Sequence, residues 1–169
     1  YTYKTSDGQS WTTGTSLGTG MYVQTIAYGN GWWTAFGQES GFTRGWQSSD
    51  GLSWTLRVSG SAEPLPVSGT YGHGLHVHFG IRPYGGYIFV WRSSDNGTTW
   101  TNTFGIPMGN SEKIISTSTG FLIFSSASIV TSTYFYSSDA ASWSYVGSSS
   151  AINDLAAKGT RIVGVRRGA

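Results

Sequence analysis

Short apolar runs alternate with polar turn residues along the whole chain. The runs "YVQTIAY" (22–28), "WWTAFG" (32–37) and "RIVGV" (161–165) are rich in aromatic and β-branched residues and are bounded by Gly or Asn-Gly. No stretch of useful length repeats apolar residues at the three- and four-residue spacing of a helix. Short runs of this composition, separated by turn signals, predict strands and hairpins. The pattern therefore predicts an all-β protein.

One short sequence word occurs four times and sets the period of the chain. It reads "TSDGQSW" at 5–11, "SSDGLSW" at 48–54, "SSDNGTTW" at 93–100 and "SSDAASW" at 137–143. Its tryptophans are 43, 46 and 43 residues apart. A period in this range is typical of propeller blades of four strands. We therefore expect one domain over residues 1–169, built from four repeats of about 37–46 residues.

The two ends of the chain supply complementary parts of one repeat. Residues 152–165 read as an inner and a second strand, and residues 1–15 read as a third strand, its turn and an outer strand. Two strands from each end would complete a blade and remove exposed sheet edges. The sequence predicts a closed four-bladed β-propeller whose last blade is closed by both termini. Because the chain opens at Tyr1, we expect it to be processed or part of something longer.

The repeated word carries turn chemistry and a packing residue. Aspartate side chains accept hydrogen bonds from backbone N–H groups just ahead of them, and Gly or Asn tolerates positive φ. The expected turn aspartates are Asp7, Asp50, Asp95 and Asp139. The tryptophans expected to pack between neighbouring blades are Trp11, Trp54, Trp100 and Trp143. Calcium binding by these carboxylates stays open, although repetition in every blade favours the structural role.

These words resemble the Asp-box (bacterial neuraminidase repeat) family, whose pattern is Ser-x-Asp-x-Gly-x-Thr-Trp. "SSDNGTTW" matches every specified position, whereas the other three words are one residue shorter and "SSDAASW" also lacks the glycine. The whole chain is similar to propeller repeats of bacteriophage tail and bacterial surface proteins. The resemblance implies the fold. It leaves the function open, because the family includes sialidases, other glycosidases, lectins, receptors and assembly factors.

The acidic residues outside the four Asp turns argue against an enzyme. They are Glu39, Glu63, Glu112 and Asp154, and a glycosidase needs two carboxyls facing each other across a bond. Glu112 and Asp154 lie at or near inner strands, so a sialidase-like glycosidase remains the second alternative. The arginines form no recognisable triad of the kind that the resemblance implies for sialidases. We expect no catalytic residue.

All three histidines lie in "HGLHVHF". On a strand, His76 and His78 point to one face, where two imidazoles could chelate a transition metal with help from His73. The alternative is a pair of polar residues bonded to neighbours or lining a wet axis. We expect no cofactor, with this pair as the metal candidate.

Varied loops on the face opposite the Asp turns are where we expect a ligand. These loops lie at 37–42, 58–69, 80–86, 104–110 and 125–132, with Gln38, Glu39 and Asn110 among their polar residues. The expected ligand-binding residues, in or beside them, are Phe42, Arg44, Arg82, Tyr84 and Arg166. Aromatic faces next to planar polar groups suit sugars.

Net charge, cysteine content and the length of the apolar stretches exclude several classes of function. A formal net charge of +2 is too small for a nucleic-acid footprint, there is no cysteine, and no apolar stretch is long enough to cross a membrane. We expect a non-catalytic recognition module on a phage virion or secreted particle, in the virion or at a cell surface, with a cell-surface glycan or protein receptor as partner. The alternative is structural decoration with other virion or assembly proteins. A homo-oligomer stays open.

Overall fold

The computed structural model describes the chain except residues 63, 83–85, 108–110, 127–130, 151 and 166–169. Every regular element in the described residues is a β-strand, which confirms the all-β prediction. No helix long and apolar enough to cross a bilayer occurs among them.

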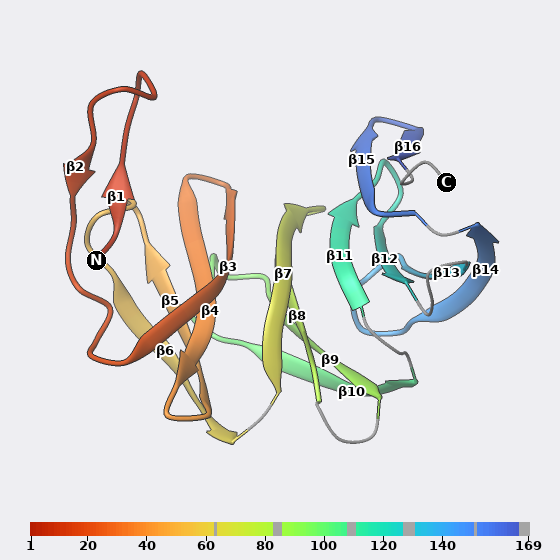
Figure 1. The fold of residues 1–169 in the computed structure, drawn as a ribbon, viewed down its shortest axis with the longest axis horizontal. Helices are drawn as coiled ribbons and strands as arrows, with labels where there is room; N and C mark the ends of the chain where they lie inside the picture. Colours follow the sequence, from red (N-terminus) through yellow and green to blue (C-terminus); the bar gives the residue numbers. More distant parts are fainter. Residues whose placement is uncertain (63, 83–85, 108–110, 127–130, 151, 166–169) are drawn as a thin grey trace.

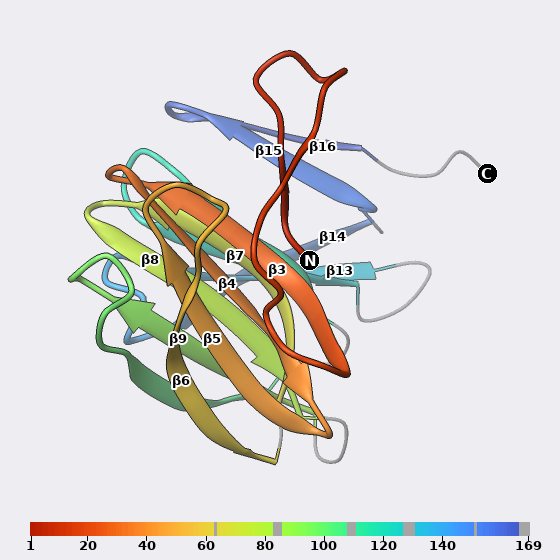
Figure 2. The same ribbon diagram turned by 90° about the vertical axis from the view of Figure 1, so that its left-hand side faces the viewer.

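Three antiparallel sheets of four consecutive strands form the body of the molecule (Figure 1). Blade 1 consists of β3 (Met21–Gly29), β4 (Trp32–Glu39), β5 (Phe42–Ser48) and β6 (Thr55–Ala62). Blade 2 consists of β7 (Leu65–Gly72), β8 (Leu75–Ile81), β9 (Tyr87–Ser93) and β10 (Thr101–Pro107). Blade 3 consists of β11 (Ser111–Ser116), β12 (Phe121–Ser126), β13 (Thr131–Ser137) and β14 (Ser144–Ser150). Figure 2 shows the four strands of blade 1 side by side. These sheets are consistent with propeller blades.

Two further hairpins lie at the two ends of the arc of blades. The N-terminal hairpin is β1 (Tyr3–Lys4) with β2 (Thr12–Thr13), and the C-terminal hairpin is β15 (Asp154–Lys158) with β16 (Arg161–Val165). They are separate two-stranded sheets on the two sides of an opening (Figure 1). The expected fourth blade, closed by both termini, is therefore not formed among the described residues.

Each hairpin is instead fixed to the blade beside it. In the N-terminal hairpin, Lys4 Nζ donates to the Asp50 carbonyl at 2.8 Å, and Thr2 Oγ1 donates to the Leu52 carbonyl at 3.3 Å. Both acceptors belong to the Asp turn of blade 1. These bonds hold the hairpin against blade 1, away from the opposite end of the arc.

The C-terminal hairpin is fixed to blade 3 by a small apolar cluster. Leu155 is buried there with Ile115, Leu122 and Phe124. Lys113 Nζ also lies 2.6 Å from the Asp154 carboxylate. The two hairpins therefore contact different blades and form separate sheets.

Blades pack face to face, with the inner strands β3, β7, β11 and β15 in contact along the arc. The main apolar core lies between blades 2 and 3 and comprises Val77, Phe79, Ile88, Val90, Ile114, Phe121, Ile123 and Ala140. Segment 58–69, expected as a loop, is mostly strand, because β6 runs to Ala62 and β7 starts at Leu65. Ser59 and Gly60 lie on the outer strand β6, whereas Ser68 and Gly69 lie within the inner strand β7.

The repeated aspartates bind the turns of the outer hairpins. Asp50 Oδ1 accepts the backbone N–H of Ser53 at 2.7 Å and of Leu52 at 2.8 Å, and the Ser48 hydroxyl at 2.9 Å. These donors stabilise the ionised form and hold the pKa of the Asp50 carboxyl well below its usual range, the Ser53 amide most strongly. The same kinds of bonds from backbone amides and a Ser or Thr hydroxyl surround Asp7, Asp95 and Asp139.

The tryptophans of the repeated word differ in their surroundings. Trp100 of blade 2 packs edge-to-face on Phe36 of blade 1, with 4.8 Å between the ring centroids. Trp143 packs against the core between blades 2 and 3. Trp11 is 59% exposed, contrary to the expectation of burial, because no blade covers the N-terminal hairpin on that side.

Candidate functional site

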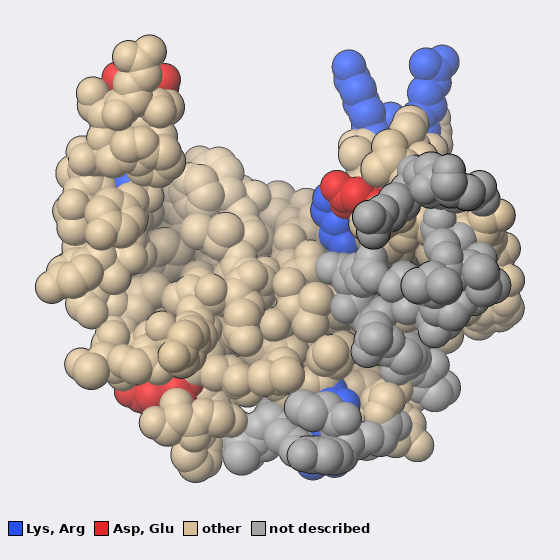
Figure 3. Space-filling view, viewed as in Figure 1, with Lys and Arg blue, Asp and Glu red and all other residues tan. Residues whose placement is uncertain are grey.

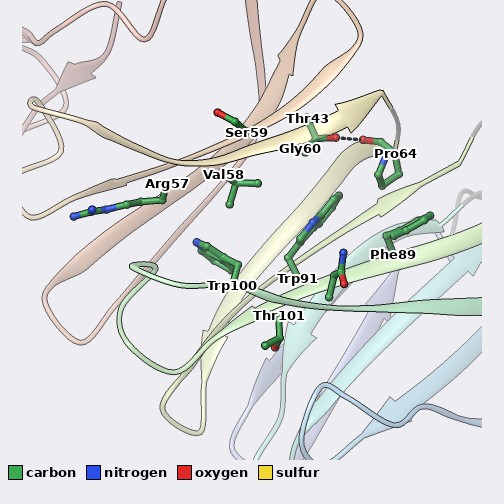
Figure 4. A pocket seen from close by; sticks show the side chains of 11 residues that line it. Thr43, Arg57, Val58, Ser59, Gly60, Pro64, Phe89, Trp91, Trp100 and Thr101 are labelled. Atoms are coloured by element: carbon green, nitrogen blue, oxygen red, sulfur yellow. Dashed lines mark hydrogen bonds between the residues drawn. The ribbon is translucent and has the colours of Figure 1, made fainter.

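A groove of about 690 Å³ runs between the outer parts of blades 1 and 2 (Figure 4). Strand β6 forms one wall, and strands β9 and β10 form the other. Its lining residues are Thr43, Arg57, Val58, Ser59, Gly60, Pro64, Phe89, Trp91, Trp100, Thr101 and Asn102. Because the groove lies between two blades, its shape depends on how their sheets pack.

Three aromatic rings border the groove, and one of them, Trp91, is only 6% exposed. Phe89 and Trp91 are two residues apart on β9, so both side chains lie on one face of the strand. Their rings are stacked at 26°, with centroids 6.4 Å apart. Trp91 is also backed by Phe36 of blade 1 at 5.1 Å. The Trp100 indole is fixed by its Nε1 donating to the Gly97 carbonyl at 2.9 Å. The rings are therefore held in place without a ligand.

A network of hydrogen bonds through Gln47, called the relay below, positions Arg57 at the edge of the groove. Arg57 is exposed on β6, and its Nε donates to Gln47 Oε1 at 2.9 Å. Gln47 is buried, and its Nε2 donates to the Asn96 carbonyl at 2.9 Å and to Thr98 Oγ1 at 3.3 Å. Asn96 and Thr98 belong to the Asp turn of blade 2. The relay thus joins the two blades and orients the guanidinium.

The rest of the lining offers hydroxyl and amide groups. Ser59 is exposed on β6, and Thr101 and Asn102 are exposed on β10. Thr43 is buried, and its hydroxyl donates to the Pro64 carbonyl at 2.9 Å (Figure 4). Such groups beside aromatic rings can hydrogen-bond sugar hydroxyls while C–H faces stack on the rings.

Among the described residues that line the groove, none carries a carboxylate. Of the acids considered for catalysis, Asp154 is exposed and paired with Lys113 at 2.6 Å. The hydrogen bond from Lys113 and the Leu155 amide lower the pKa of the Asp154 carboxyl, which favours its ionised form over that of a proton donor. Glu39 is paired with Arg44. Glu63 lies outside the described residues, as does the side chain of Glu112.

The predicted ligand-binding residues that the structure describes lie on strand β5 and just after strand β8. Phe42 begins β5 and is exposed, and the Arg44 guanidinium lies 5.8 Å from its ring centroid. Arg44 Nε also contacts Glu39 Oε2 at 3.1 Å. Arg82 is exposed after β8, and its backbone N–H donates to the Tyr87 carbonyl at 3.0 Å. The structure brings Phe42 and Arg44 together and places Arg82 on the equivalent loop of blade 2.

Tyr84, Arg166 and Asn110 lie outside the described residues. Of the predicted ligand-binding residues that the structure describes, Phe42, Arg44 and Arg82, none lines the groove. Sequence reasoning missed the groove, although the spacing of Phe89 and Trp91 signals two aromatic side chains on one strand face. The opposite wall comes from another repeat, so no local pattern could join Arg57 to these rings.

The histidine pair lies in the contact between blades 1 and 2, where both side chains are fully buried. Since the Gly29 carbonyl can only accept, His76 Nε2 is the donor at 3.2 Å. His76 Nδ1 then accepts from the Thr34 hydroxyl at 3.1 Å. Thr34 Oγ1 accepts from His78 Nε2 at 2.8 Å, and His78 Nδ1 accepts from Thr25 Oγ1 at 3.2 Å. With this assignment each of the four hydrogen bonds has one donor and one acceptor, and both imidazoles are neutral.

These hydrogen bonds define the role of the histidine pair in the structure. All four ring nitrogens have hydrogen-bond partners, which matches the polar-residue alternative to a metal site. No group of three or more potential metal ligands occurs in the described parts of the chain. Burial lowers the pKa of His76, and burial together with the His76 charge lowers the pKa of His78 to about 3. His73 lies apart on the surface, where its Nε2 contacts the Thr117 carbonyl at 2.9 Å.

Comparison with known proteins places the chain in no family. No known protein family matches it, and no curated protein is a significant relative. Solved structures that resemble it include the exo-inulinase from Aspergillus awamori, with a TM-score of 0.49 and 14% sequence identity. That match covers 79% of this chain and 38% of the exo-inulinase chain. The Asp-box likeness therefore rests on the sequence words and their turn geometry.

Proposed function

We propose that the protein is a non-catalytic recognition module that binds carbohydrate in the groove between blades 1 and 2. The observation that carries the proposal is the combination of Phe89, Trp91 and Trp100 with Arg57 and Asn102 in one groove. Its volume of about 690 Å³ lies within the range of small-molecule sites. Fixed rings and an oriented guanidinium reduce the entropy lost on binding.

We further propose that the natural ligand is a cell-surface glycan and that the protein acts on a virion or secreted particle. An open groove of this kind suits weak binding at a single site. Firm attachment would then depend on many copies acting together.

The test begins with a glycan array probed with the full chain. The best glycan is then titrated against the protein by following tryptophan fluorescence. Arg57→Ala and Asn102→Ala should each weaken binding at least several-fold. Asn102→Ala should leave the melting temperature nearly unchanged, because its side chain is exposed, whereas Arg57→Ala should also lower it, because the buried Gln47 Oε1 loses its donor.

Arg44→Ala is the matched control. Like Arg57, Arg44 lies on a strand of blade 1 and uses its Nε in a side-chain hydrogen bond, but it is not itself among the described residues that line the groove. Loss of binding in Arg44→Ala or Arg82→Ala, with normal binding in Arg57→Ala, would move the site to the loop face. A protein that binds no glycan would favour the structural role in an assembly.

A further inference from the structure

The two ends of the arc expose apolar side chains that complete blades would cover. On β16, Val163 is 65% exposed and Val165 is 59% exposed. On β3, at the other end, Ile26 is 53% exposed and Tyr28 is 54% exposed. The N-terminal hairpin leaves a hollow of about 230 Å³ beside Ile26, lined largely by aromatic rings.

The contact between blades 1 and 2 shows that these exposed residues lack a neighbouring blade to cover them. Counted from the first residue of the strand after the inner hairpin turn, Val163 and Val165 occupy the positions of Thr34 and Phe36. Thr34 and Phe36 are fully buried because blade 2 covers them. Each end of the arc therefore carries one side of an unfilled blade contact.

The exposed sheet edges are complementary as well. In a complete fourth blade, the C-terminal hairpin would supply the inner and second strands, and the N-terminal hairpin would supply the third and outer strands. In their two-stranded sheets, β16 and β1 are both edge strands. In blade 1, Thr34 pairs with Gln47, and the equivalent pair across the gap is Val163 opposite Lys4.

Charge at the hairpin tips favours the same pairing. The exposed Lys158 and Arg161 flank the turn of the C-terminal hairpin, and the exposed Asp7 lies in the turn of the N-terminal hairpin. Figure 3 shows the basic tip and the acidic tip on opposite sides of the opening. In the register of blade 1, Arg161 would lie next to the Asp turn of its partner hairpin.

We propose that a second copy of this chain fills the contact, head to tail, so that β16 of one copy pairs with β1 of the next. The two hairpins of one chain do not meet, because Lys4 is bound to the turn of blade 1 and Leu155 is buried against blade 3. A second copy supplies the two missing strands in the required order. It also covers Val163, Val165, Ile26 and Tyr28 and brings opposite charges together.

Engineered cysteines test the pairing, because the chain has none of its own. Lys4→Cys and Val163→Cys are prepared as two separate proteins, since both positions are exposed. The bonds from Thr2 and Thr15 to the Leu52 carbonyl still hold the N-terminal hairpin to blade 1 in Lys4→Cys. The two are mixed at equal concentration and oxidised mildly, and the products are separated by non-reducing electrophoresis. We expect a disulfide-linked dimer that joins one copy of each variant, with little dimer from either variant alone.

The matched control mixes Val163→Cys with Leu56→Cys, an exposed position on β6 that the proposed contact does not include. That mixture should give no dimer above the background of the single variants. A Lys4→Cys/Val163→Cys double variant that forms its disulfide within one chain at low concentration would overturn the proposal in favour of closure by the same chain. A mixture that yields no specific dimer, with a sedimentation mass that stays monomeric at all concentrations, would also overturn it. Neither result bears on glycan binding in the groove.

Discussion

Mild acid should destabilise the protein through the two buried histidines. Burial lowers the pKa of His78 to about 3, against an ordinary value of 6.5, and lowers the pKa of His76 in the same direction. The unfolded chain therefore binds protons at pH values where the folded chain does not. Stability is fully present above about pH 6.5 and falls as the pH drops toward the folded pKa.

The size of the effect follows from linkage. Each pH unit below the unfolded pKa costs about 1.4 kcal/mol per histidine, so His78 alone should cost about 2 kcal/mol between pH 7.5 and pH 5. His76 adds to the loss with the same sign. The turn aspartates contribute little in this window, because the ordinary pKa of aspartate is 3.8 and it is lowered further in the fold.

The assay is urea unfolding followed by tryptophan fluorescence at pH 7.5 and pH 5.0. A His76→Gln/His78→Gln double variant should be less stable at pH 7.5 but lose most of the pH dependence. His73→Gln, which removes the exposed histidine, should keep the pH dependence of the unmodified protein. Equal pH dependence in the double variant and the unmodified protein would refute the assignment to the buried pair.

Three further substitutions test the contacts that hold the blades and turns. Thr34→Val should lower the free energy of unfolding by about 2–4 kcal/mol, because it leaves two buried imidazole nitrogens without partners, whereas Thr55→Val on the exposed side of β6 should change it little; urea unfolding measures both. Gly29→Ala should destabilise by about 1–3 kcal/mol, since a Cβ there would collide with the Tyr71 ring across the blade contact, whereas Gly60→Ala should be tolerated; thermal melts compare the two. Asp50→Ala should lower the melting temperature through lost turn bonds yet leave glycan affinity unchanged, and a fall in affinity at unchanged stability would contradict its turn role.

Local patterns predicted the strands and turns, because these depend on neighbouring residues. The word around Asp50 fixes its own hairpin through bonds to Leu52 and Ser53. The spacing of the repeated tryptophans likewise predicted sheets of four strands, as the structure shows.

Contacts between repeats could not be predicted from local patterns, because they join residues that are far apart in the sequence. The closed fourth blade was expected from strand content alone, yet the Lys4 and Leu155 contacts keep the two hairpins apart. The alternation in "HVHF" identified two side chains on one face, but their partners Thr25 and Thr34 come from another blade. The groove also belongs to two repeats, so it appears only when their packing is known.

Carbohydrate binding in the groove between blades 1 and 2 is the central claim, and the indole N–H signals of the tryptophans test it most directly. Protein labelled with 15N is titrated with the best glycan from the array, and each indole signal is assigned by substitution. We expect the signals of Trp91 and Trp100 to shift in a saturable way, because both rings line the groove. Trp11 and Trp33, which line the hollow beside the N-terminal hairpin, should stay unchanged. Saturable shifts at Trp11 and Trp33 with none at Trp91 and Trp100 would contradict the account.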